Sequence, residues 1–515
     1  MTSRFHHMIR WLLFLVIASC CGLPLVAADN TDWARVHSLT VRGIDELYSL
    51  EMDTADRTFD EVIQMAANDP RGYFFKGMIH FWIYNFNKDE GEFKKFFDLS
   101  DRVIEKCERL LGQNKNDAVA KFYLGGIYGY RGLAYQRDGA LLKAAWDGRK
   151  GYSLLKEAAA DTNLIDAQMG FGLFTYLVGK VPKSFRWLLN IFGFSGDLEG
   201  GLNALKLAAD RGVYTQSEAS FFLSTFLNIE QRYDEAYIYL DRLLKKHPEN
   251  TLFLILYAQW EFRQERMESA LQAVKKAIEI NERKKVKYGG EFAYSVLAHY
   301  TFLQGDFENA RINYETYLKN VENPKAVPNL VYYRLGTCYE LKGERGPATW
   351  AYGQMQKVEL GKGNPWDAFY YRRGQERLKR AMDEIDQKLI KAENEYSMKQ
   401  YKKAKTIYES IVEKNPIDND RLALALYGLI QIAQDEEMHN EGEMYGRKLL
   451  ALKLDQEKWL LPHTHFRLGQ IYAKRGLTAE ARREFEAVER YKNYDFEQRL
   501  KGRVEEQLEK PKDVK

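Results

Sequence analysis

The stretch YYRLGTCYELKGERGPATWAYGQM, residues 332–355, decides the fold because a second stretch matches it in frame. Its first half carries an apolar stripe at helical spacing, and its second half carries a small residue and an aromatic one; these positions are Leu335, Gly336, Tyr339, Ala348 and Tyr352. The stretch HFRLGQIYAKRGLTAEARREFEAV, residues 465–488, has the same spacing without a gap, at Leu468, Gly469, Tyr472, Ala481 and Phe485. Two copies in frame indicate an internal repeat that consists of two helices joined by a polar turn.

Partial copies of the pattern occur along the chain. A third copy has Tyr294, Leu297, Ala298, Ala310, Tyr314 and Tyr317. Two second halves end in a proline, with Ala236, Leu240, Leu243 and Pro248 in one, and Ala404, Tyr408, Ile411 and Pro416 in the other. Shorter copies lie at Ala270, Val274 and Ala277, and at Ala55, Phe59 and Val62.

This pattern resembles the tetratricopeptide repeat. A small residue on each helix of a hairpin lets the two helices cross closely, and aromatic side chains fill the space between neighbouring hairpins. A proline ends the second helix so that the next hairpin can begin. Each hairpin leaves an apolar face that only the next hairpin can bury. The sequence therefore predicts an all-α protein, a tetratricopeptide-type α-solenoid with an irregular helical N-terminal part.

The spacing of the repeats predicts how the chain is divided. The expected segments are a signal peptide at 1–28, an irregular helical N-terminal repeat domain at 29–213, tetratricopeptide repeats at 214–360, a long connecting helix at 361–396, C-terminal repeats at 397–495 and a charged tail at 496–515. The connecting helix is expected because the segment after Pro365 carries charges at helical spacing, with Gly374 as its only weak point.

The N-terminus predicts export. Arg4 and Arg10 precede an apolar core that is too short to span a bilayer, and small residues follow it before Asp29. Ordinary cleavage before Asp29 would release a soluble protein, with the periplasm as the expected location. The stretch IASC, which ends at Cys20, instead resembles a bacterial lipobox and would give an outer-membrane lipoprotein with a lipidated Cys20. A retained membrane anchor is the remaining alternative.

An apolar insertion at 179–195 interrupts the N-terminal domain between two expected helices. It permits two interpretations. It could be a membrane or partner patch that consists of Lys183, Phe185, Arg186, Trp187, Leu188, Ile191 and Phe192. It could instead be a capping helix buried in the N-terminal bundle, because Phe185, Leu188, Leu189 and Phe192 recur at the spacing of a helical core.

The stretch GFGLFTYLVGKVPKSFRWLLNIFGFSGDLEGGLNAL, residues 170–205, resembles the tetratricopeptide repeat protein thirty-nine and inclusion-body-clearance family. The matching positions are Pro182, Gly193, Phe194, Gly196, Asp197, Gly201, Leu202 and Leu205. The resemblance implies an all-helical, non-enzymatic adaptor, of a family linked with membranes, lipid droplets and protein turnover. The export signal departs from those proteins, so only the architecture carries over.

The sequence contains none of the common catalytic motifs. It has no HExxH motif and no GxxxxGK[ST] loop, and Ser195 lies in GFSGD without the strand and final glycine of a nucleophile elbow. His463 and His465 lack the further ligands that a zinc site needs. We therefore expect no enzyme activity, no cofactor and no metal. Cys107 and Cys338 are expected to be two buried, unpaired thiols.

Binding of another protein is the expected function. The formal net charge is only +3, which provides no basic face for nucleic acid. The repeat frame predicts a concave groove on the first helices of three hairpins, lined by Phe292, Ser295, His299, Phe302, Leu330, Tyr333, Thr337, Glu340, His463, Phe466 and Gln470. An extended peptide or an amphipathic helix would suit this groove. Some of these aromatic residues could equally pack between repeats. The sequence leaves the partner's identity and the oligomeric state open.

Overall fold

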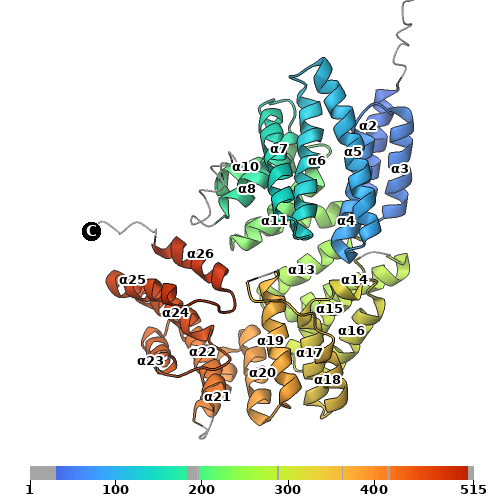
Figure 1. Ribbon diagram of the computed structural model, residues 1–515. Helices are drawn as coiled ribbons and strands as arrows, with labels where there is room; N and C mark the ends of the chain where they lie inside the picture. Colours follow the sequence, from blue (N-terminus) through green and yellow to red (C-terminus); the bar gives the residue numbers. More distant parts are fainter. Residues whose placement is uncertain are drawn as a thin grey trace, which may run out of the picture.

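The computed structural model describes residues 31–181, 194, 196–286, 289–361, 363–413 and 418–508. These residues form α-helices and two short 3₁₀-helices, with no strand among them (Figure 1). Within this described part, no helix is both long and apolar enough to cross a membrane.

Successive helices pack against each other as antiparallel hairpins. In the N-terminal half the pairs are α2 (Trp33–Tyr48) with α3 (Met52–Met65), α4 (Arg71–Asn87) with α5 (Glu90–Gln113), α6 (Ala118–Arg137) with α7 (Leu141–Ala159), and α8 (Ala167–Gly179) with α10 (Leu198–Arg211). In the middle they are α11 (Gln216–Ile229) with α12 (Tyr233–Lys246), α13 (Thr251–Arg263) with α14 (Met267–Lys284), α15 (Phe292–Leu303) with α16 (Phe307–Asn320), and α17 (Asn329–Leu341) with α18 (Arg345–Gly353). The 3₁₀-helix η1 (Pro324–Ala326) lies between the last two of these pairs.

The C-terminal third begins with α19 (Pro365–Lys379), which packs on α17 and α18. Three hairpins follow: α20 (Glu384–Ser397) with α21 (Tyr401–Val412), α22 (Asn419–Asp435) with α23 (His439–Leu450), and α24 (Leu460–Lys474) with α25 (Thr478–Ala487). The 3₁₀-helix η2 (Val488–Arg490) and helix α26 (Glu497–Leu508) complete the described chain. The stacked hairpins confirm the predicted all-α solenoid.

The predicted small residues lie at the helix crossings. The seven alanines predicted for this position of the second helices are buried; they are Ala55, Ala236, Ala270, Ala310, Ala348, Ala404 and Ala481. Gly336 faces the ring of Tyr352, and Gly469 faces the ring of Phe485, so closely that a Cβ atom on either glycine would lie 2.5 Å from the nearest ring carbon. The small residues thus set the distance between the helices of each hairpin.

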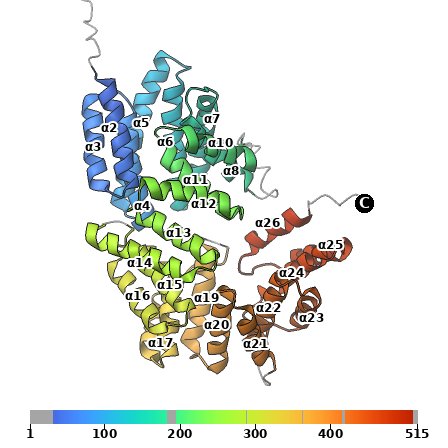
Figure 2. The same ribbon diagram turned by 180° about the vertical axis from the view of Figure 1, so that it is seen from behind.

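The solenoid bends into an open arc in which the C-terminal helices α24–α26 return toward the N-terminal half (Figures 1 and 2). Contacts between distant segments hold this curvature. The side-chain amide of Asn250 donates to the carbonyl of Tyr48 at 2.6 Å, and that of Asn394 donates to the carbonyl of Phe302 at 2.7 Å. Lys399 pairs with Glu265 at 2.9 Å.

The irregular N-terminal part is a degenerate hairpin stack. Helices α8 and α10 form one hairpin and cross where a Cβ atom on Gly172 would lie 2.8 Å from the carbonyl oxygen of Gly201. The apolar insertion lies between these two helices in the sequence, as predicted. Residues 182–193 and 195, which include the possible membrane or partner patch, lie outside the described residues, as does Cys20.

The single connecting helix predicted at 361–396 is wrong, because two helices occupy this segment. Helix α19 ends at Lys379, and Asp383 begins α20 with a capping box: its side chain accepts from the backbone N–H of Asp386, whose side chain accepts in return from that of Asp383. This reciprocal pair satisfies backbone donors at a helix start and so fixes the break. Gly374, the expected weak point, is buried inside α19.

The charged tail predicted at 496–515 is also wrong over its described part. Residues from Glu497 to Leu508 form α26, which packs on α25 and η2. Leu500 and Val504 are buried because their spacing of four residues places both on the inner face of the helix. Residues 509–515 lie outside the described part.

Candidate functional site

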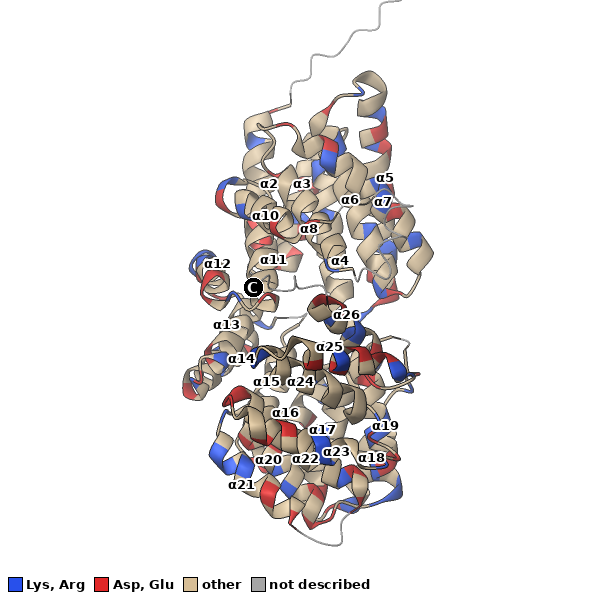
Figure 3. Ribbon diagram, turned by 90° about the vertical axis from the view of Figure 1, so that its left-hand side faces the viewer, with Lys and Arg blue, Asp and Glu red and all other residues tan. Residues whose placement is uncertain are grey.

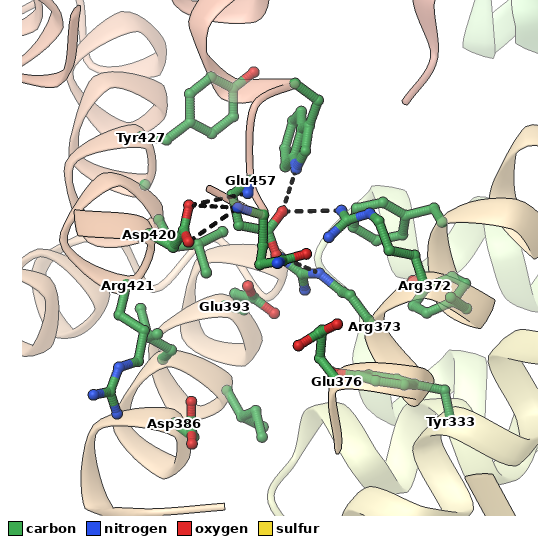
Figure 4. A pocket seen from close by; sticks show the side chains of 18 of the residues that line it. Tyr333, Arg372, Arg373, Glu376, Asp386, Glu393, Asp420, Arg421, Tyr427 and Glu457 are labelled. Atoms are coloured by element: carbon green, nitrogen blue, oxygen red, sulfur yellow. Dashed lines mark hydrogen bonds and ion pairs between the residues drawn. The ribbon is translucent and has the colours of Figure 1, made fainter. Parts of the chain in front are cut away.

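A cleft of about 760 Å³ opens on the concave side of the C-terminal half of the arc (Figure 4). Its walls come from α15, α17, α19, α20, α21, α22, α24 and α26, and from the loops before α24 and α26. The first helices of the hairpins supply most of this lining, as expected of a tetratricopeptide-type stack. The cleft is therefore assembled from segments that are far apart in the sequence.

Aromatic rings form one side of the cleft. Phe496 lies 4.6 Å from Trp366 and 5.3 Å from Phe369, measured between ring centroids, and Trp459 lies 5.9 Å from Phe369. We call these four residues the aromatic cluster. Rings at these separations attract one another through dispersion and edge-to-face contacts, and they offer a firm apolar surface to a ligand.

Glu457 lies at the centre of the cleft and contacts three of its side chains. Its carboxylate lies 3.1 Å from Arg372 and 3.3 Å from Arg373, and it accepts the indole N–H of Trp459. Burial alone would raise the pKa of Glu457, but the charges of Arg373 and Arg372 outweigh burial and lower it. Both arginines thus face the cleft with a fixed counter-ion (Figure 4).

The loop that carries Glu457 is positioned by Asp420 at the start of α22. The Asp420 carboxylate accepts backbone N–H groups from Asp455 at 3.2 Å, from Gln456 at 3.1 Å and from Glu457 at 3.0 Å. Three donors on one side chain fix the loop conformation and direct Glu457 toward α19.

A second ion-pair group lies at the junction of α19 and α20. Asp386 lies 2.7 Å from both Arg377 and Arg380. Burial would raise the pKa of Asp386, but the hydrogen bonds from Arg377 and Arg380 outweigh burial and hold it well below its ordinary value. This carboxylate is permanently ionised near neutral pH and serves to position the two arginines.

Glu393 differs from the other carboxylates. It projects from α20 into the cleft, where solvent reaches it although helices surround it (Figure 4). Within the described residues, its carboxylate has no ion pair and no side-chain hydrogen bond. The surrounding protein raises its pKa, against the lowering effect of the nearby Arg373. Glu393 is thus the least constrained acid in the cleft.

Four of the eleven predicted groove residues line this cleft: Phe302, Tyr333, Thr337 and His463. Tyr333 lies on the α17 side, with its ring 5.3 Å from that of Tyr370. His463 lies beside the aromatic cluster, 5.1 Å from Trp459. The repeat frame thus brought together residues from α15, α17 and α24.

The other seven predicted residues lie outside this cleft, which corrects the prediction that all eleven share one groove. Phe466 is buried against Phe485, at a centroid distance of 5.6 Å. Glu340 is buried and paired with Arg345. The remaining five are Phe292, Ser295, His299, Leu330 and Gln470.

Two of these side chains contact the neighbouring hairpin instead. Gln470 accepts from Gln434 at 3.0 Å, and His299 meets Arg334. Phe292 instead packs within its own hairpin, 6.4 Å from Tyr317. Burial, together with the charge of Arg334, lowers the pKa of His299 well below its ordinary value. Each hairpin is rotated relative to the hairpin before it. Part of the helix face that the repeat frame assigned to the groove therefore packs against the neighbouring hairpin.

Sequence reasoning missed the arginines of α19, which are the main charged groups of the cleft. The stretch FYYRRGQERLKR, residues 369–380, is predicted only as part of one long connecting helix with charges at helical spacing. Arg373 and Arg377 are four residues apart, so both lie on one face of the helix. The aromatic residues next to them indicated that this face packs against other parts of the protein.

The remaining chemistry in the described chain is sparse. No group of three or more potential metal ligands occurs among the described residues. Cys107 and Cys338 are both buried and unpaired, as predicted, and burial raises the pKa of each thiol, to about 12 for Cys338. Positive and negative side chains are interspersed along the helices (Figure 3).

Comparisons with known proteins gave one family match and several similar solved structures. The family model for Iml2/Tetratricopeptide repeat protein 39 matches residues 157–372, which is less than half of the chain. The human IFIT1 dimer with PPP-AAAA is 15% identical, with 90% of this chain and 96% of that chain covered and a TM-score of 0.37. The yeast Tom70 structure is also 15% identical, with coverage of 84% and 96% and a TM-score of 0.26. The P58(IPK) TPR domain is 12% identical, with coverage of 92% and 98% and a TM-score of 0.20. The stacked hairpins and the family match identify the chain as a tetratricopeptide-type helical-repeat protein that is similar to the Iml2/Tetratricopeptide repeat protein 39 family.

Proposed function

We propose that this protein is an exported, non-catalytic scaffold whose concave cleft binds a segment of another protein. The observation that carries the proposal is the cleft itself, in which rings and guanidinium groups from eight helices face one open space of about 760 Å³. Aromatic and arginine side chains are the residues that most often dominate binding energy in protein interfaces.

The cleft favours binding over catalysis. General acid–base chemistry needs a group with a pKa near the working pH and a geometry that reaches the substrate. Asp386 and Glu457 are instead held ionised by their arginine partners. Glu393 has a raised pKa, but no described nucleophile or base is hydrogen-bonded to its carboxylate.

The lining suits an extended peptide or one face of an amphipathic helix. The aromatic cluster would receive a large apolar side chain, and the polar groups along α19 and α22 would bond to the partner's main chain and polar side chains. Such a site needs only modest movement of the scaffold, because the ion pairs already fix its walls.

Blocking the cleft tests this proposal. Leu424 and Gln431 line the cleft from α22, two helical turns apart. Leu424→Trp and Gln431→Trp would fill it, whereas Ile312→Trp would place the same indole on the exposed face of α16. We expect both cleft variants to lose a co-purifying partner that wild type and Ile312→Trp retain. Equal partner recovery in all four proteins would contradict the proposal.

The export part of the proposal rests on the N-terminal sequence. Cleavage before Asp29 would release the scaffold into the periplasm, and intact-mass analysis of the mature protein tests it. A lipidated Cys20 as the first residue would instead support the outer-membrane lipoprotein alternative. A mature chain that begins at Met1 would contradict export by either route.

A lipid surface is the second candidate ligand, and one observation favours it. Leu141, Leu142 and Trp146 on the first turns of α7 are 66%, 86% and 58% exposed. Lys143 and Arg149 on the same helix add positive charge, which suits anionic headgroups.

Liposome flotation tests the lipid candidate. Leu142→Glu should abolish flotation with anionic vesicles, whereas Ile238→Glu, at an exposed position of α12, should leave it unchanged. Absence of flotation by the wild-type protein would remove this candidate.

A further inference from the structure

Several arginines of the cleft have a carboxylate as a counter-ion. Arg372 and Arg373 share Glu457, and Arg377 and Arg380 share Asp386. Arg499 and Arg503 of α26 line the end of the cleft, and Arg467 of α24 lies outside the lining but near enough to act on Arg503 by its charge. None of the three lies within ion-pairing distance of a carboxylate in the described chain. We call these three residues the arginine wall.

Aromatic and amide groups hold the arginine wall in place. Arg467 donates to the side-chain oxygen of Gln434 at 2.6 Å, and its guanidinium lies 5.8 Å from the ring centre of Tyr427. Arg503 lies 4.5 Å from the ring centre of Phe466, and Arg499 precedes it by one helical turn. Neutral contacts therefore position Arg467 and Arg503 and leave them without an ion pair.

The charges of the arginine wall act on one another. Burial lowers the pKa of Arg503, and the charge of Arg467 lowers it further. Burial also lowers the pKa of His463, to about 3, with help from Arg467 and Arg503. Two carboxylates act on the wall from outside ion-pairing distance: Asp435, already bonded to the Tyr396 hydroxyl at 2.7 Å, and Glu506.

Uncompensated cations in a partly enclosed site favour an anionic ligand. Guanidinium groups bind carboxylates through two parallel hydrogen bonds, and this pairing is strengthened where water is partly excluded. The neutral His463 lies between the arginine wall and the aromatic cluster, 6.4 Å from Phe496. A ligand with a carboxylate next to a large apolar group would match both surfaces at once.

We propose that the arginine wall binds carboxylate side chains of an acidic partner segment, with an adjacent aromatic or large aliphatic residue on the aromatic cluster. This inference rests on the proposed function and specifies the chemistry of the partner. Asp420, Glu393, Glu376 and Glu457 face the same cleft and would repel a continuous phosphate backbone, so a peptide fits better than a nucleic acid.

Fluorescence anisotropy with two labelled peptides tests the inference. One peptide carries a central Glu-Trp-Glu sequence in a Gly/Ser context, and the other carries Gln-Trp-Gln. We expect the full mature protein to bind the Glu peptide about tenfold more tightly, since charge-assisted hydrogen bonds contribute more than neutral ones. This preference should decrease with added salt.

Substitutions assign the preference to the arginine wall. Arg467→Gln combined with Arg503→Gln should remove the difference between the peptides. Arg499→Gln should reduce it at an exposed position, where folding is not at risk. Arg483→Gln, an equal charge change on the exposed surface of α25, should keep the full difference.

Three results would overturn the inference. Equal affinity for both peptides would show that the cleft binds peptides without selecting carboxylates, which leaves the proposed function standing. Binding of neither peptide would exclude this acidic sequence class from the cleft, and the cleft-blocking test above would still decide the proposed function. Tighter binding of an RNA oligonucleotide than of the Glu peptide would assign the arginine wall to phosphate.

Discussion

Adding one methyl group at Gly336 tests the helix packing on which the repeat assignment depends. In Gly336→Ala, the new Cβ atom would lie 2.5 Å from Cε1 and 2.7 Å from Cζ of the Tyr352 ring. The ring cannot move aside easily, because Tyr352 is completely buried. Overpacking of this kind costs about 1–3 kcal/mol. A contact of 2.5 Å with a completely buried ring belongs in the upper part of this range, at about 2–3 kcal/mol. The better helix propensity of alanine returns about 1 kcal/mol, so the expected net loss of stability is about 1–2 kcal/mol.

Native-state hydrogen exchange of the full chain measures this loss where it occurs. A loss of about 1–2 kcal/mol corresponds to amide exchange that is roughly 5–30 times faster, and it should be concentrated in α17 and α18 because each hairpin contacts only its neighbours. Gly346→Ala is the matched control. The same substitution there meets no atom within 4 Å, so the amides of α18 should exchange no faster than in wild type.

A comparison of the two variants shows whether the close crossing of α17 and α18 determines the stability of this hairpin. If Gly336→Ala exchanges as slowly as Gly346→Ala, the close crossing of α17 and α18 does not limit this hairpin. The sequence pattern of small residues would then have another cause.

Three further predictions concern stability and thiol chemistry. Burial raises the pKa of Glu218 to about 7, although hydrogen bonds from Tyr130 and Tyr48 lower it. The protonated Glu218 side chain therefore contributes to the free energy of unfolding below about pH 4.5, and this contribution is lost as the pH rises to about 7. Wild type should therefore lose up to about 3 kcal/mol relative to Glu218→Gln across this range in urea titrations, and parallel pH profiles would contradict the prediction. Asp383→Ala should cost about 1 kcal/mol by removing the cap of α20, measured from the denaturation midpoint, whereas Glu384→Ala next to it should change the midpoint little. Iodoacetamide should leave Cys107 and Cys338 unmodified in the folded protein and alkylate both in denaturant, and rapid modification of the folded protein would show that these thiols are accessible.

The sequence predicted the hairpins because each depends on local spacing. Gly336 and Ala348 are small residues at the point where α17 and α18 cross, so the sequence shows where these helices meet. The gapless match at Gly469 and Ala481 gave the positions of the repeat. The break between α19 and α20 was also encoded, by the carboxylates of Asp383 and Asp386, but these were interpreted as part of a charged helix surface. Periodicity alone does not distinguish a solvated face from a capped helix start.

The cleft could not be predicted because its contacts join distant hairpins. Arg372 bonds to Glu457, 85 positions later, and to Asp495, 123 positions later. Helix α26 closes the end of the cleft and had been assigned to a tail. The curvature of a solenoid is the sum of many small rotations, which no single repeat encodes.

Site-specific photo-crosslinking from inside the cleft tests the central claim most directly. A photoreactive phenylalanine analogue at Leu424 would face the cleft, and the same analogue at Trp350 would face solvent from α18. Our account predicts that Leu424 crosslinks in cells to a defined segment of one protein partner and that Trp350 does not crosslink to that segment. Crosslinking of the same segment from Trp350 alone would contradict it.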